Sequence, residues 1–137
     1  MSTRAQVQVI EDGKVELTLY HHTDGYPSHM LDCIRNAAQV ARGTEFAKIG
    51  WAWEAGRAGK VASFLCTAHP GTMEPEAGHA LHGDIEYLYR LNVDKACDPK
   101  TRYWEAEILS REYDENGFVG PGVKFQKKTH TALVPLK

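Results

Sequence analysis

Residues 4–20, RAQVQVIEDGKVELTLY, decide the fold and predict a β-hairpin. Apolar and polar side chains alternate on both sides of Asp12-Gly13, which is the period of a half-buried strand. Asp12 and Gly13 tolerate the positive φ angles of a tight hairpin turn. We therefore expect two antiparallel strands at the start of the chain.

After the hairpin, the apolar side chains recur at the spacing of a helix. Ser28 can cap a first helix by accepting a backbone hydrogen bond, and Thr44 can cap a second. Gly59 is expected to interrupt that second helix. Residues 60–68 fit either a third short helix or a strand, and their apolar pattern leaves both open.

The C-terminal half alternates again over residues 85–93 and 103–108, which predicts two neighbouring antiparallel strands. Between helices and strands, residues 70–83 contain two prolines and three glycines. This composition predicts a long loop, and a loop of that length is either mobile or functional. A hairpin turn at Asn116-Gly117 and a short strand near the C-terminus complete the expected elements.

Strands grouped apart from helices indicate the α+β class, and we expect an antiparallel sheet of about four to five strands with two or three helices packed on one face. A chain of 137 residues fits a single domain, residues 1–137.

Bulk properties exclude several function classes. The formal net charge is −2 and the pI is near 6.4, so no global basic field attracts nucleic acid. No apolar run approaches the roughly 20 residues of a membrane helix, and residues 1–6 lack the apolar core of a secretory signal. We expect a cytoplasmic protein without membrane contact. The three cysteines form no Cys-x-x-Cys pair and are expected to be reduced packing residues.

Histidines and carboxylates gather in two segments, HHTDGYPSH at 21–29 and HALHGD at 79–84. A metal site needs such ligands to converge. Adjacent strand residues His21 and His22 point to opposite faces, so at most one of them can reach a shared ion. We expect no metal, no cofactor and hydrogen-bonded or surface histidines.

Catalysis has one candidate pair, His22 as a base oriented by Asp24. The sequence contains no nucleophile elbow and no phosphate-cradling glycine-rich loop. We expect no catalytic residues, with a small His/Asp-dependent hydrolase as an alternative. Asp24, Gly25 and Pro27 have strong turn preferences, which favour a structural role for them.

Ligand binding is the third possibility. Tyr87 and Tyr89 share one face of their expected strand and should face the core, which leaves Arg90 and Asn92 together on the opposite face. Arginine is suited to an anionic ligand. The expected ligand-binding residues are His22, Asp24, Tyr26, Arg90, Asn92, Asp94 and Arg111.

Residues 3–7, TRAQV, and 19–27, LYHHTDGYP, resemble a group of small phage, prophage and plasmid proteins. That group shares a Tyr-x-His-x-Asp-Gly-Tyr-Pro segment, often with Arg at the position of His21. Residues 84–89, DIEYLY, are similar to a second strand of the group. The likeness covers the first quarter of the chain and part of its middle.

The resemblance implies an accessory protein that counters host defence. Thoeris anti-defence sponges bind cyclic ADP-ribose-type signals in α+β oligomers, and Arg90, Asn92, Asp94 and Arg111 are similar to a set that would hold ribose and phosphate. We therefore expect a non-enzymatic, homo-oligomeric protein that sequesters a cyclic nucleotide or cyclic ADP-ribose-type signal. The alternative is an anti-CRISPR protein that occludes a host defence complex through residues 70–83 or the C-terminal hairpin.

Overall fold

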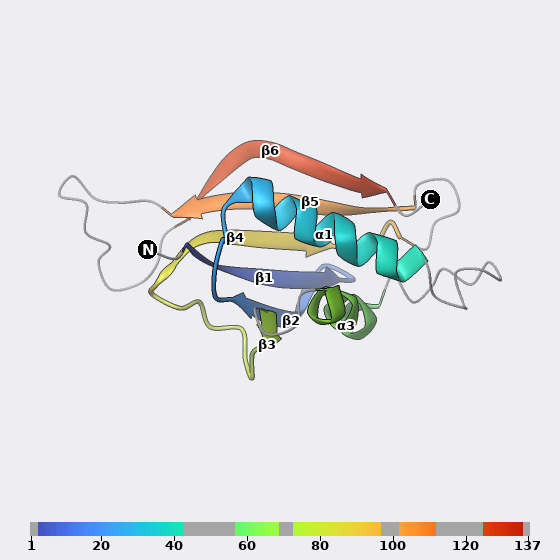
Figure 1. Cartoon of the computed structure of the whole chain (residues 1–137), viewed down its shortest axis with the longest axis horizontal. Coiled ribbons are helices and arrows are strands. Elements are labelled where there is room, and N and C mark those ends of the chain that lie inside the picture. Colours follow the sequence, from blue (N-terminus) through green and yellow to red (C-terminus); the bar gives the residue numbers. More distant parts are fainter. Residues whose placement is uncertain (1–2, 43–56, 69–72, 97–101, 112–124, 136–137) are drawn as a thin grey trace.

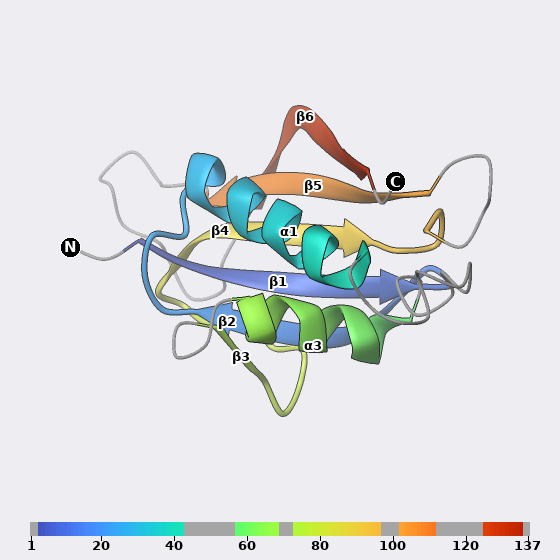
Figure 2. The same cartoon turned by 45° about the vertical axis from the view of Figure 1, so that its right-hand side comes forward.

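The computed structural model describes residues 3–42, 57–68, 73–96, 102–111 and 125–135. Within these residues the chain forms one six-stranded sheet, in the order β3-β2-β1-β4-β5-β6, with two helices on one side of it (Figure 1, Figure 2). The elements are β1 (Arg4–Glu11), β2 (Lys14–His21), α1 (Pro27–Arg42), α3 (Ala58–Ala68), β3 (Met73–Pro75), β4 (Ile85–Asn92), β5 (Tyr103–Arg111) and β6 (Phe125–Pro135). The α+β class is confirmed.

The sheet is larger than expected and is not purely antiparallel. β1 and β4 are parallel neighbours at its centre, whereas every other neighbouring pair is antiparallel. β3 lies inside the expected loop over 70–83, and it pairs with the end of β2 through three residues. A strand this short, ending at Pro75, has no alternation that a sequence pattern could reveal.

Both described helices differ from the expected boundaries. α1 begins at Pro27, and the Tyr26 carbonyl accepts the first helical hydrogen bonds from the amides of His29 and Met30. Ser28 therefore lies inside the first turn, and its predicted role as cap is wrong. Proline suits the first helical position because its missing N–H would have no helical partner there.

Residues 60–68 belong to a helix, α3, which also includes Gly59. A carboxylate oxygen of Glu11, at the end of β1, accepts a 2.7 Å hydrogen bond from the Ala58 amide and caps this helix. The expected helix after Thr44 and the turn at Asn116-Gly117 lie outside the described residues. Neither described helix is long and apolar enough to cross a membrane.

The core lies between the sheet and the helices. Val7, Leu19, Tyr89 and Trp104 are fully buried there, each from a different strand. Strand periodicity places Arg90 on the opposite face from Tyr89, as predicted. We call the face without helices the outer face.

Residues 76–84, the cover loop, lie on the outer face across β1 and β2. The Gln6 side chain donates to the Ala80 carbonyl at 3.2 Å and accepts from the His82 amide at 3.0 Å. The Thr18 hydroxyl contacts a ring nitrogen of His79 at 2.9 Å. Gln6 and Thr18 are consequently buried although they are polar and face away from the core.

Candidate functional site

The segment from His21 to His29 separates its side chains between the two faces of the sheet. His21 is 1% exposed and faces the core, whereas His22 is half-buried and points outward. The predicted opposition of these two histidines is confirmed. The carboxylate paired with His22 is that of Glu74 on β3, at 2.9 Å, and not that of Asp24.

Asp24 and Gly25 carry backbone constraints. Asp24 has a φ of 53°, a conformation that Asp tolerates better than most residues. Gly25 packs directly on β1: its amide donates to the Thr3 carbonyl at 2.7 Å, and its carbonyl accepts the Tyr89 hydroxyl at 2.6 Å. These contacts of Gly25 hold the start of α1 on the sheet.

A polar group surrounds Tyr20 at the edge of the outer face, and we call it the Tyr20 cluster. Its members come from β1, β2 and the residue after it, β3 and the cover loop: Arg4, Tyr20, His22, Glu74, Glu76, His82 and Asp84. The rings of His22 and His82 lie 4.7 and 4.8 Å from the Tyr20 ring, both in edge contact. His82 pairs with Glu76 at 2.8 Å, which gives the cluster two imidazole–carboxylate pairs.

Asp84 connects the cluster to β1. Its carboxylate accepts the Tyr20 hydroxyl at 2.8 Å and lies 3.4 Å from the Arg4 guanidinium. Burial, together with the hydrogen bond and the charge of Asp84, raises the pKa of Tyr20 to about 12. Tyr20 is therefore a neutral hydrogen-bond donor at physiological pH.

The residues of the second histidine segment do not converge on one point. His79 contacts Thr18, whereas His82 and Asp84 both contact Tyr20, through its ring and its hydroxyl respectively. These contacts with β2 hold the cover loop against the sheet.

Arg90 and Asn92 line a pocket at the other end of the outer face. This Arg90 pocket has a volume of about 240 Å³, and its lining residues are Ile10, Gly13, Arg90, Asn92, Glu105 and Glu107. Arg90 lies opposite Glu107, and Asn92 lies opposite Glu105, in the β4–β5 register. Within the described part of the chain, the buried Nε of Arg90 has no hydrogen-bond partner.

The structure does not gather all seven expected ligand-binding residues. Asp94 accepts a hydrogen bond from the Asp12 amide at 2.7 Å and so supports the hairpin turn. Arg111 lies four residues beyond Glu107 on β5 and donates to the Gly83 carbonyl. At roughly 3.3 Å per strand residue, Arg111 is about 13 Å from Arg90 along the sheet. His22, Asp24 and Tyr26 lie at that same distant end.

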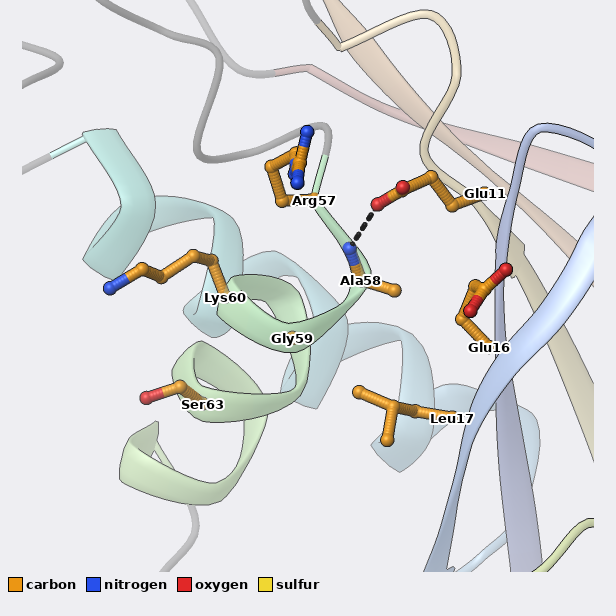
Figure 3. Close-up of a pocket in the computed structure, with 8 residues that line it drawn as sticks. All are labelled: Glu11, Glu16, Leu17, Arg57, Ala58, Gly59, Lys60 and Ser63. Carbon is orange, nitrogen blue, oxygen red and sulfur yellow. Dashed lines mark hydrogen bonds between the residues drawn. The ribbon is translucent and has the colours of Figure 1, made fainter.

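A second pocket, of about 640 Å³, lies beside the start of α3. Figure 3 shows Glu16 and Leu17 of β2 on one side and Lys60 and Ser63 extending away on the other. The Glu11 carboxylate already binds the Ala58 amide, which is the position that an anion would take at this helix end. The anion position at this helix end is therefore already occupied by a side chain of the protein itself, although the pocket is larger than the Arg90 pocket.

No protein-family model, no curated protein and no solved structure matches this chain.

Proposed function

We propose that the protein is a non-enzymatic binding protein of a phage or mobile element, which sequesters a nucleotide-type signal as a homo-oligomer in the host cytoplasm. The resemblance of residues 19–27 to phage and plasmid proteins supports the biological context. The single observation that carries the binding function is the Arg90 pocket, with its buried guanidinium nitrogen without a partner among the described residues.

The chemistry of the pocket favours a sugar hydroxyl group. Glu105 and Glu107 are acceptors for hydroxyl donors, in the way that acidic residues bind the ribose of dinucleotides. The Arg90 guanidinium supplies donors for a ligand oxygen. Two carboxylates beside one guanidinium disfavour a bare phosphate by charge repulsion. A ribose ring is therefore the part of the ligand that suits the pocket best.

The size of the pocket points the same way. Small-molecule sites usually measure about 300–1,000 Å³, and the Arg90 pocket is smaller, at about 240 Å³. It can hold a sugar but not a complete nucleotide. The rest of the ligand would extend along the outer face, where Gln8 neighbours Arg90 in the β1–β4 register.

Native mass spectrometry tests the proposal, on protein purified from cells with an active nucleotide-based defence system. A retained small molecule of nucleotide mass, released intact on denaturation, is the expected result. Arg90→Ala should weaken its binding about 10- to 150-fold, because a hydrogen bond to a charged group contributes about 1.5–3 kcal/mol.

The matched control is Arg35→Ala. Arg35 is exposed on α1, where it pairs with Asp32 at 3.3 Å, and its removal should leave binding unchanged. Arg111→Ala measures the reach of the ligand, since only a ligand extending about 13 Å from Arg90 can contact both arginines. A mass without ligand from such cells refutes sequestration and favours the occlusion of a CRISPR complex, which a pull-down would detect.

The Tyr20 cluster supports a second candidate function, acid–base hydrolysis. Each of two histidines is paired with a glutamate, an arrangement that orients an imidazole for proton transfer. Turnover of a phosphodiester or ester substrate that is lost in both His22→Asn and His82→Asn, with the fold intact, would identify an enzyme. Turnover that persists in both variants would exclude these histidines.

A further inference from the structure

Three side chains of metal-binding types converge between α1 and the end of β2: His21, His29 and Cys33. One ligand atom of each lies within 4.8 Å of those of the other two. The imidazole rings of His21 and His29 are stacked, with centroids 5.8 Å apart. His21 and Cys33 are buried, and His29 is half-buried. We call these residues the His–Cys triad.

Two independent features of the fold bring the three residues of the triad together. His29 and Cys33 are four residues apart on α1, so their side chains lie on the same face of the helix. His21 ends the core-facing row of β2 that includes Leu17 and Leu19. The contacts of Gly25 with Thr3 and Tyr89 fix the start of α1 above this row.

From this convergence we propose that His21, His29 and Cys33 form a binding site for a transition-metal ion of the zinc type. Imidazole nitrogen and thiolate sulfur are the ligands that such borderline-soft ions prefer. The set contains no carboxylate, which makes calcium and magnesium poor occupants.

The geometry requires only a small adjustment. Zinc binds imidazole nitrogen at about 2.0–2.1 Å and thiolate sulfur at about 2.3 Å, so ligand atoms in a tetrahedral site are roughly 3.5 Å apart. The ligand atoms of the triad lie within 4.8 Å of one another, and side-chain rotations of His29 and Cys33 on the helix can shorten these distances to about 3.5 Å. Three protein ligands leave the fourth position for water or another molecule. The ion would tie the first half of α1 to β2.

Cobalt(II) is the probe for this site, because it substitutes for zinc and its thiolate complexes absorb in the near-ultraviolet and visible. Titration of the metal-free full-length chain should produce a thiolate-to-cobalt charge-transfer band that zinc then abolishes. Cys33→Ser should remove the band. His29→Gln should weaken binding at least about 100-fold, since even the loss of outer-shell partners costs 10- to 100-fold in metal affinity.

Cys66 provides the control. It lies on α3, and Cys66→Ser should retain the band and the affinity of the original chain. His29 is only half-buried, so His29→Gln tests the site even if Cys33→Ser does not fold, which circular dichroism would reveal.

The proposal is overturned if the folded chain gives no charge-transfer band, if the band survives Cys33→Ser, or if His29→Gln binds cobalt as tightly as the original chain. It does not depend on the nucleotide proposal. Arg90→Ala should bind cobalt normally, because Arg90 lies on the outer face and the triad lies on the core side.

Discussion

Gly25→Ala tests the structural role of Gly25 in holding the start of α1 on β1. A Cβ atom on Gly25 would lie 2.7 Å from the Ala5 Cβ and 3.0 Å from both the Arg4 carbonyl carbon and the Thr3 oxygen. Carbon atoms in contact are normally about 3.5–4.0 Å apart, so the segment must move by roughly 1 Å. Two of the nearest atoms belong to the backbone, which cannot rotate away as a side chain can.

The expected loss of stability follows from these contacts. Overpacking costs about 1–3 kcal/mol. The hydrogen bonds of Gly25 with Thr3 and Tyr89 contribute about 0.5–1.5 kcal/mol each, and displacement weakens both. We expect Gly25→Ala to lower the free energy of unfolding by about 2–4 kcal/mol, measured by urea denaturation.

Gly59→Ala is the matched control. A Cβ on Gly59 meets no atom within 4 Å, and alanine favours helix, so this change should stabilise the chain by up to about 1 kcal/mol. Tyr89→Phe, combined with Gly25→Ala, should cost about 1 kcal/mol less than the sum of the single changes, because both act on one hydrogen bond. If Gly25→Ala unfolds at the same urea concentration as the original chain, the close packing on β1 does not limit this position.

Three further changes test other parts of the molecule. Folding raises the pKa of Tyr20 from its ordinary value of 10.0 to about 12. The stability that this group contributes is therefore intact below pH 10 and is lost as the pH rises toward 12. The urea midpoint of Tyr20→Phe should decline less over that range than the midpoint of the original chain. Gln6→Leu removes the hydrogen-bond partner of the Ala80 carbonyl and of the His82 amide. We expect the free energy of unfolding to fall by about 1–3 kcal/mol and proteolysis within the cover loop to become faster. Unchanged cleavage would contradict the role of Gln6 in holding that loop. Glu11→Ala removes the carboxylate at the start of α3, and a loss of about 1 kcal/mol is expected in thermal unfolding, whereas Glu16→Ala, beside the same pocket, should have little effect.

Alternation of side chains was sufficient to predict β1, β2, β4 and β5, because each has a buried face and a period of two. The same rule correctly placed Tyr89 inside and Arg90 outside. It could not predict that β1 and β4 are neighbours, since pairing between strands about 80 residues apart leaves no local pattern. β3 was missed because it has only three residues.

The candidate site was less predictable than the fold. His22 pairs with Glu74, 52 positions away, rather than with Asp24, which lies near it in sequence. The proposed His–Cys triad had one local signal, the spacing of His29 and Cys33 by four positions on an expected helix. The position of Cys33 on the apolar side of that helix predicts a packing residue. The approach of His21 to it depends on how α1 crosses the sheet, which no local pattern reveals.

The parallel pairing of β1 with β4 has a consequence for synthesis of the chain. Arg4 pairs with Ile85, which is synthesised about 80 residues later, so this strand pairing cannot form before then. At about 5–20 residues per second, that interval lasts roughly 4–16 s on the ribosome. During this time one edge of β1 lacks its final partner, and the nascent chain should be more sensitive to protease when arrested before β4 than after β5. The N-terminal hairpin can close early, but the centre of the sheet forms only after β4 has been translated.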